Sequence, residues 1–323
     1  MTHAVRIHET GGPSVLRWEE VEAGAPGPGE ARVRHAAVGL NFIDTYHRSG
    51  LYPLPLPAVI GSEGAGTVVA VGPGVTEVVA GDRVAYAGPV GAYAEERLVP
   101  AHRLVPLPDG FDERLAAAAM LKGMTAQYLL RRTHRVEPGE TVLLHSAAGG
   151  VGLIAAQWAK SLGATVIGTV SSDEKAALAR EAGCAHVVVT SREDFVARVR
   201  EITGGAGVRV VYDAVGKDTF LRSLDCLAPL GLMVSYGNAS GPVEPVSPLL
   251  LAQKGSLFLT RPTLMAYTAR RDDLLSSAAD LFAVLLSGAV KVRIGATFAL
   301  RDAAAAHVAL EGRKTTGSTL LLP

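Results

Sequence analysis

A glycine-rich turn at residues 147–152 carries the clearest chemical signal in the chain. It reads Ala147-x-Gly149-x-x-Gly152, follows a short apolar run and leads into an amphipathic helical pattern. A turn with this spacing lets a pyrophosphate approach the backbone and seats the helix closely on the strand. Free amides at the helix start, with the helix dipole behind them, favour the anion. Ala147 replaces the usual first glycine, and a merely structural turn is the alternative, but the flanking strand and helix favour a dinucleotide site.

The residues after the second predicted strand indicate which dinucleotide would bind. That strand ends in Ser171 and Ser172, where a site specific for NAD carries an acid about 20 residues past the turn. Ser171 and Lys175 offer hydroxyl and ammonium donors there, and a cation in a first helical turn is unfavourable unless it meets an anion. This favours a 2'-phosphate pocket and hence NADPH. Two alternatives stay open: Ser172 or Asp173 merely caps the next helix with Lys175 solvated, or Asp173 binds the ribose, which would favour NADH.

The elements that would position these residues change character along the chain. The first hundred residues hold short β-like runs between glycine and proline turns, which predict a mainly β, barrel-like region. A helical pattern runs from 111 to 130, and strands then alternate with helices. This alternation predicts an α/β fold with a doubly wound, six-stranded parallel sheet of Rossmann type. Its strands are predicted near 141–145, 165–170, 186–189, 208–213, 231–236 and 255–259.

After residue 261 the chain is expected to return to its first part. The patterns there predict a helix near 270–286, a strand near 296–299, a helix near 302–310 and a last strand at 318–322. We therefore assign residues 1–122 and 262–323 to a catalytic domain, and residues 123–261 to a dinucleotide-binding domain. The ligand is expected in the cleft between these two domains.

Composition limits the functions that fit the chain. Its 323 residues exceed the usual size of a single core, and 48% hydrophobic residues can fill two. With 31 basic and 31 acidic residues, it lacks a charge signature for nucleic acid or an anionic membrane. It has neither an apolar signal region nor an apolar stretch of spanning length, so we expect a cytoplasmic protein. Cys184 and Cys226 lack metal or redox spacing and are expected to be buried free thiols.

Long segments of the chain resemble a known family. Residues 38–50 read Val-Gly-Leu-Asn-Phe-Ile-Asp-Thr-Tyr-His-Arg-Ser-Gly, residues 61–74 read Gly-Ser-Glu-Gly-Ala-Gly-Thr-Val-Val-Ala-Val-Gly-Pro-Gly, and residues 204–261 continue the likeness. Together with the glycine turn, they resemble the medium-chain dehydrogenase/reductase superfamily, in its zeta-crystallin-like quinone oxidoreductase branch. The likeness covers essentially the whole chain. It implies a GroES-like catalytic domain, a Rossmann domain, NADPH as cofactor and a quinone as substrate.

This chain differs from the zinc enzymes of the superfamily at the positions of their zinc ligands. Those enzymes place a cysteine where this chain has Asn41 and a histidine where it has Ser62, and they add a loop with four cysteines. Glu63 remains, but a lone carboxylate cannot hold zinc, which takes about four ligands. We therefore predict no zinc. Glu63 is expected to be structural and paired with a basic residue that the sequence does not identify.

A site without metal suits a quinone. Oxidising an alcohol by hydride transfer needs a Lewis acid for the developing alkoxide, whereas a quinone is already electrophilic and yields a weakly basic hydroquinone anion. Positioning and one or two hydrogen-bond donors then suffice. The resemblance implies Asn41, Tyr46 and Tyr52 as these groups, although both tyrosines fit a packing role equally well. Asp44 and His47 are interpreted as structural or solvated.

The resemblance also implies where the cofactor binds. Arg313 would reach an adenine or phosphate group, and its alternative is an exposed cation at a helix end. Thr190 stands where related enzymes often carry a tyrosine, and a threonine cannot stack on the adenine. The implied cofactor residues are Asn41, Thr125, Gly149, Gly150, Val151, Gly152, Ser171, Lys175, Tyr236, Asn238, Leu259, Thr260, Arg261 and Arg313.

The sequence leaves two other functions open and predicts an assembly. A zinc-free enone or enoyl reductase needs the same hydride delivery, with Tyr46 or Tyr52 protonating carbon. A non-catalytic NADPH-binding protein, crystallin-like or RNA-binding, is a second alternative, although the neutral charge argues against RNA. A hydrolase is excluded because the chain has neither a GxSxG nor a Walker-type motif. The sixth strand would expose an apolar edge, so we expect a homodimer through that strand.

Overall fold

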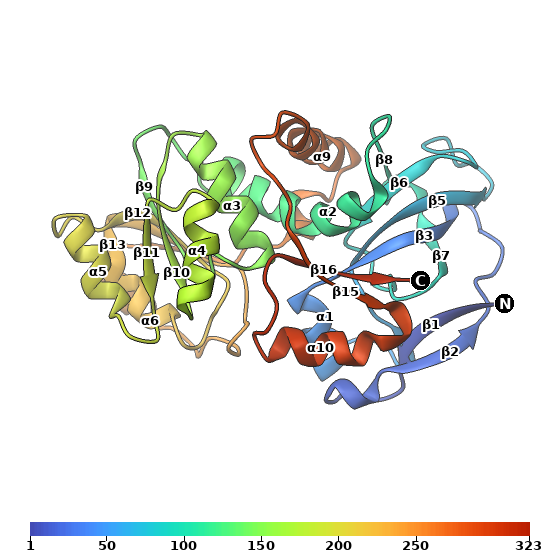
Figure 1. Ribbon diagram of the computed structural model, residues 1–323, viewed down its shortest axis with the longest axis horizontal. Helices are drawn as coiled ribbons and strands as arrows, with labels where there is room; N and C mark the ends of the chain where they lie inside the picture. Colours follow the sequence, from blue (N-terminus) through green and yellow to red (C-terminus); the bar gives the residue numbers. More distant parts are fainter. The chain divides into compact units, whose positions relative to one another are not determined.

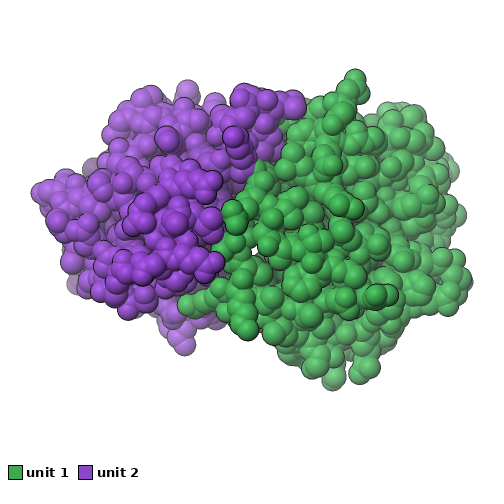
Figure 2. Space-filling model, in the orientation of Figure 1, with its two compact units in different colours: residues 1–124, 268–282, 292–323 green, residues 125–267, 283–291 purple.

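The computed structural model describes all residues from 1 to 323. The chain forms two compact units, which Figure 2 shows in two colours. The first unit contains residues 1–124, 268–282 and 292–323, and the second contains residues 125–267 and 283–291. Residues 262–267 and 283–291, placed in the catalytic domain from the sequence, thus fall in the second unit. The backbone of Lys291 bonds the Gln157 side-chain amide at 2.9 and 3.0 Å, and the Tyr267 ring stacks on that of Tyr128.

Antiparallel pairing dominates the first unit. Its larger sheet has the order β15-β16-β3-β5-β6-β8, with β7 also on β3, and its smaller sheet has the order β2-β1-β4. The last strand β16 pairs with β3, which brings the C-terminus back to the N-terminal part of the chain (Figure 1). The strands are β1 (Thr2–Ile7), β2 (Arg17–Val21), β3 (Glu30–Leu40), β4 (Ala58–Val59), β5 (Glu63–Val71), β6 (Arg83–Ala87), β7 (Glu96–Pro100), β8 (Val105–Pro106), β15 (Ile294–Ala299) and β16 (Ser318–Leu322).

Four longer helices accompany these sheets, and two of them cross between the units. Helix α1 follows β3 directly, and α10 lies between the two C-terminal strands. Helices α2 and α9 each begin in the first unit and end in the second. Their bounds are α1 (Phe42–Ser49), α2 (Glu113–Tyr128), α9 (Arg271–Leu286) and α10 (Ala303–Glu311).

The second unit is a six-stranded parallel sheet with the order β11-β10-β9-β12-β13-β14. Counted from β9, this is the 3-2-1-4-5-6 order of the doubly wound dinucleotide-binding fold, so the predicted fold class is confirmed. Helices α3 and α4 lie on one side of the sheet and α5 on the other (Figure 1). The elements are β9 (Thr141–Leu144), α3 (Gly150–Ser161), β10 (Thr165–Val170), α4 (Asp173–Glu181), β11 (His186–Val189), α5 (Phe195–Ile202), β12 (Val208–Asp213), α6 (Phe220–Ser223), β13 (Leu227–Ser235), α7 (Pro248–Gln253), β14 (Phe258–Thr260) and α8 (Leu264–Tyr267).

One strand begins earlier than its sequence pattern predicts. Strand β13 starts at Leu227, whereas the apolar pattern predicts a start near 231. Leu230 adopts a left-handed backbone conformation (φ 59°), and the pairing register with β12 shifts at this point. The irregular stretch is therefore a bulge inside the strand, which resembles a turn when the sequence is considered alone.

Each unit has its own apolar core. In the second unit, strand residues such as Leu143, Ile167 and Val211 pack with Phe195 and Phe220 from the helices. Both cysteines are buried and free, as predicted, and burial raises the pKa of each thiol to about 12. None of the helices has the length and apolar character needed to cross a membrane.

Candidate active site

The glycine turn lies between β9 and α3. Gly149 caps α3 with an extended backbone and without a side-chain bond, and the first amides of a helix lack partners inside it. Those amides belong to Gly150, Val151 and Gly152. A side chain at Gly152 would collide with the carbonyl oxygen of Ser146, so this position needs glycine. The local geometry is that of an anion site at a helix N-terminus.

The missing first glycine is compensated from the neighbouring strand. Ala147 is fully buried, and its amide donates to Thr169 of β10 at 3.0 Å. The methyl group of Ala147 lies against Gly168, where an added Cβ would come within 2.8 Å of it and within 2.7 Å of the Cys184 sulfur. The Ala147 methyl group therefore fits because Gly168 on β10 has no side chain.

A buried histidine, which sequence reasoning missed, supports the turn. His145 lies two residues before Ala147 and bonds Thr169 Oγ1 at 2.9 Å and Ser223 Oγ at 2.8 Å. Ser223 donates its own hydrogen to the Thr219 carbonyl, so it accepts from His145 Nε2. Burial lowers the pKa of His145, which keeps the imidazole neutral in this role. The histidine thus fixes the end of β9 against β10 and α6.

The groups predicted to select the cofactor lie together at the end of β10. Lys175 Nζ is 3.5 Å from Ser171 Oγ. Ser172 caps α4 by accepting the Lys175 backbone amide at 3.4 Å, so the capping alternative and the cationic site are compatible. Asp173 pairs with Arg192 at 2.6 Å, with both side chains exposed.

Arg192 is a cation near the end of β10 that sequence reasoning missed, and it pairs with Asp173 of α4. It follows Thr190, whose amide and hydroxyl both bond the Val170 carbonyl at the end of β10, at 2.9 and 3.1 Å. Thr190 therefore borders the same strand end as Ser171. The signal in the sequence was the position of Arg192 three residues after β11, near the carboxyl edge shared by parallel strands.

The remaining predicted residues of the second unit follow the ends of neighbouring strands. Asp213 ends β12, is fully buried, and accepts the amides of Val215 and Gly216 at 2.7 and 3.2 Å. Tyr236 and Asn238 follow β13, and the Tyr236 amide donates to the Asp213 carbonyl at 2.8 Å. Leu259, Thr260 and Arg261 lie at the end of β14, and Thr125 is buried on α2.

In the first unit, Glu63 is the centre of a buried polar cluster. It is fully buried and accepts from Lys122 Nζ at 2.5 Å, the Leu121 amide at 2.6 Å and Asn41 Nδ2 at 3.1 Å. Lys122 is the basic partner that the sequence did not identify. Since a carboxylate only accepts, the Asn41 group that faces it is the NH₂, which also donates to the Gly39 carbonyl at 3.3 Å. The amide oxygen of Asn41 is then its remaining acceptor.

These donors do not fit a zinc ion. Asn41 gives its amide to Glu63, and Ser62 gives its hydroxyl to Asp44 at 2.7 Å. No group of three or more histidine, cysteine, aspartate or glutamate side chains is placed to hold a metal. The Glu63 oxygens are already bonded by nitrogen donors, and a tetrahedral N, S or O set is lacking.

The two predicted tyrosines lie together in the first unit. Their rings are 5.3 Å apart at 70°, and the Tyr52 amide donates to the Tyr46 carbonyl at 3.1 Å. The His47 ring lies 6.0 Å from that of Tyr52, and burial lowers the pKa of His47. Asp44 and His47 are both buried, so the solvated alternative for these two residues is wrong. Arg313 is exposed in the turn after α10, with φ 56°.

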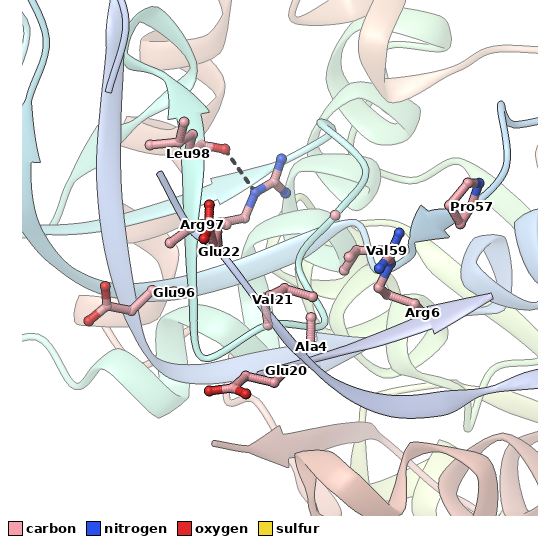
Figure 3. Close-up of a pocket in the computed structure, with 13 residues that line it drawn as sticks. Ala4, Arg6, Glu20, Val21, Glu22, Pro57, Val59, Glu96, Arg97 and Leu98 are labelled. Atoms are coloured by element: carbon pink, nitrogen blue, oxygen red, sulfur yellow. Dashed lines mark hydrogen bonds between the residues drawn. The ribbon is translucent and has the colours of Figure 1, made fainter. Parts of the chain in front are cut away.

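A separate pocket of about 610 Å³ lies in the first unit and is lined by β1, β2 and β7 (Figure 3). It contains none of the predicted site residues. Arg97, which borders it, donates to the carbonyls of Pro89, Val90 and Leu98, and its other charged residues are of both signs. We assign it no part in the chemistry.

Two family models match this two-unit architecture. Residues 27–109 match the alcohol dehydrogenase GroES-like domain, and residues 150–282 match the zinc-binding dehydrogenase family. The fold and the glycine turn thus define a dehydrogenase/reductase of the medium-chain type. The chain belongs to the quinone oxidoreductase branch of that superfamily, which confirms the resemblance found in the sequence.

The similarity extends over entire chains. A quinone oxidoreductase of Pseudomonas aeruginosa is 55% identical, with 100% of both chains covered. A 2-haloacrylate reductase of a Burkholderia species is 51% identical, covering 100% of this chain and 99% of the relative. The crystal structure of the Escherichia coli quinone oxidoreductase complexed with NADPH has a TM-score of 0.98 at 49% identity, covering 99% of this chain and 100% of that one.

The buried ion pair makes a prediction about stability. Lys122→Met leaves the Glu63 charge buried without its partner, so the free energy of unfolding should fall by about 3–5 kcal/mol. Adding Glu63→Gln should recover most of that loss. Urea unfolding followed by circular dichroism at pH 7.5 measures both.

The matched control is the exposed pair of Arg34 and Glu96, 2.7 Å apart with Arg34 66% exposed. Arg34→Met should cost about 1 kcal/mol or less because solvent screens this pair. If Lys122→Met and Arg34→Met lowered the free energy of unfolding by the same amount, burial of the Glu63–Lys122 pair would not be what makes it important for stability.

Proposed function

We propose that this protein is an NADPH-dependent oxidoreductase that reduces quinones by direct hydride transfer without zinc. The observation that carries the proposal is the full-length similarity to quinone oxidoreductases, of which one is 55% identical. The replacement of both zinc-ligand positions by Asn41 and Ser62, each engaged with a buried carboxylate, supports a reaction without metal. We further propose that the first unit is catalytic and the second binds the dinucleotide.

The residues of the second unit suit NADPH. The first-turn amides of α3 would hold the pyrophosphate, and Ser171 with Lys175 would bind the 2'-phosphate by charge-assisted hydrogen bonds. Arg192 would add a second cation at that position if it left Asp173. Thr125, Tyr236, Asn238 and the end of β14 (Leu259, Thr260 and Arg261) are proposed for the nicotinamide end, and Arg313 for the adenosine end.

The first unit would act on the substrate by orientation and hydrogen bonding. NADPH supplies the hydride when it is bound. Both amide hydrogens of Asn41 are used, so its oxygen is proposed to accept from the nicotinamide ribose. Tyr46 and Tyr52 would then donate to the quinone oxygen that gains charge, because phenol hydroxyls in a partly apolar site stabilise a developing anion. A hydroquinone anion needs no stronger Lewis acid.

Reduction of an activated carbon–carbon double bond is the second candidate function. It is favoured by one observation, the 51% identity to a 2-haloacrylate reductase over the full chain. In this reaction Tyr46 or Tyr52 would deliver a proton to carbon after hydride addition.

We also propose a cytoplasmic homodimer that pairs through β14. This strand is at the edge of its sheet and has only β13 as a neighbour. Phe258 and Leu259 on this strand are 60% and 40% exposed. An exposed apolar edge strand is usually covered by another element or by a partner chain. The two free thiols suit a reducing compartment such as the cytoplasm.

Anaerobic turnover of the purified protein is the direct test. NADPH should be consumed with benzoquinone and naphthoquinone, and a chelator should leave the rate unchanged. Consumption with an enone or haloacrylate alone would establish the second candidate instead. Tight NADPH binding without any turnover would contradict both and leave a binding protein.

Cofactor choice should depend on Lys175. Lys175→Glu removes a charge-assisted bond to the 2'-phosphate, worth roughly 1.5–3 kcal/mol, so NADPH affinity should fall about 10- to 100-fold. NADH affinity should change little, because NADH lacks that phosphate. Fluorescence titration measures both constants. Lys291→Glu, an exposed change of the same charge in the same unit, is the control, and an equal loss there would contradict the assignment.

The assembly should depend on the edge strand. Phe258→Asp places a charge at the proposed interface and should convert a dimer into a monomer in light scattering. Val308→Asp, on α10 of the first unit and 58% exposed, should leave the dimer intact. A monomeric wild-type protein, or a Phe258→Asp variant that stays dimeric, would rule out this interface.

A further inference from the structure

A second buried carboxylate, that of Asp44, belongs to the first turn of α1. Asp44 is fully buried and accepts three hydrogen bonds, from the Ser62 hydroxyl at 2.7 Å, the Asn41 backbone amide at 2.9 Å and the Tyr93 hydroxyl at 3.1 Å. Burial raises the pKa of Asp44 to about 7, and these three bonds oppose the rise. The carboxylate therefore depends on its donors to stay ionised near neutral pH.

Tyr93 continues this cluster to the C-terminal helix α10. His307 Nε2 lies 3.0 Å from the Tyr93 hydroxyl, and His307 Nδ1 lies 3.0 Å from Arg48. Arg48 also forms a bidentate pair with Glu311 at 2.7 and 2.9 Å. We call Asp44, Tyr93, His307, Arg48 and Glu311 the Asp44 network. Two helices and a loop far apart in the chain are joined by it.

The direction of every hydrogen bond in the Asp44 network can be assigned. Arg48 only donates, so Nδ1 of His307 must accept and the imidazole proton is on Nε2. That proton is given to the Tyr93 oxygen, and Tyr93 gives its own proton to Asp44. Burial lowers the pKa of His307 to about 3, which keeps this neutral form. The donors that run from Arg48 through His307 and Tyr93 therefore point toward an ionised Asp44, while Arg48 also donates to Glu311.

Asp44 in turn holds residues next to the Glu63 cluster. It binds the backbone amide of Asn41, whose side chain reaches Glu63, and the hydroxyl of Ser62, which precedes Glu63 in the chain. We infer that the Asp44 network positions Asn41 for the cofactor, and that α10 thereby helps to set the geometry of the active site. Asp44, Tyr93 and His307 are positioning residues in this role. The inference rests on the proposed function for Asn41.

The charged and titratable groups around Asp44 come from four elements and a loop. Glu63 of β5 raises the pKa of Asp44, and Lys122 of α2 neutralises Glu63 in part. Tyr93 belongs to the loop before β7, Arg48 to α1, and His307 to α10, with Glu311 beyond it. Below about pH 7, Asp44 takes up a proton and can no longer accept from all its donors. When kcat/KM and NADPH affinity are plotted against pH, both should therefore fall on the acid side as Asp44 takes up its proton. We call this fall the acid limb.

The test compares Tyr93→Phe with Tyr86→Phe. Tyr86 is also fully buried in the first unit and bonded to a histidine, His35, at 2.8 Å, but it does not bond Asp44. Removing the Tyr93 hydroxyl removes a bond that lowers the pKa of Asp44. The acid limb of kcat/KM, and of NADPH affinity, should then move to higher pH by about one unit. Tyr86→Phe should lower stability without moving the limb.

Ser62→Ala removes another donor to Asp44 and should move the limb in the same direction, which keeps the test open if Tyr93→Phe folds poorly. The 2'-phosphate titrates near this range in every variant, so the differences between variants are the readout. Limbs that stay at the wild-type pH in both variants, with only a lower melting temperature, would overturn the inference. A wild-type protein without turnover would refute the proposed function, whereas shifted NADPH affinity in the variants would still support the positioning role.

Discussion

The burial of Glu63 and Lys122 as a pair is the constraint on which the first unit depends. An isolated charge in a protein interior is very unfavourable, so each of these residues requires the other and the surrounding donors. The Leu121 amide and the Asn41 side chain complete the set, which ties α2 and the start of α1 to β5. Gly39 has no side chain because a Cβ there would collide with Glu63.

In this chain, the two positions that correspond to zinc ligands in related enzymes serve buried hydrogen bonds instead. Asn41 and Ser62 donate to two buried carboxylates, Glu63 and Asp44, and each carboxylate also accepts a backbone amide. The chemistry proposed for the site needs little more than orientation and two phenol hydroxyls, because a quinone is an electrophile before the protein acts on it. A buried cluster whose polar groups are paired with one another is well suited to such a task.

In the second unit, the comparable constraint is the glycine turn between β9 and α3. Anion binding at a helix start requires a tight turn with backbone close to the ligand, and Gly149 and Gly152 meet that need. Ala147 departs from the usual pattern, and Gly168 on the adjacent strand accommodates its methyl group. The alanine in this turn therefore depends on the absence of a side chain at Gly168, 21 residues further along the chain. His145 and Asp213, both buried, fix the strand ends around this turn.

Local patterns determined the strands and the glycine turn: β10, β11 and β12 begin and end where the sequence predicts, because alternating apolar runs and glycines act over a few residues. The family followed from the long matching segments. Three-dimensional folding decided the rest. The partner of Glu63 is 59 residues away, Tyr93 meets His307 across 214 residues, and the bulge at Leu230 exists only through its pairing with β12. Pairs of buried charges and hydroxyls leave no periodic signal, since their energy depends on distance and burial rather than on spacing along the chain.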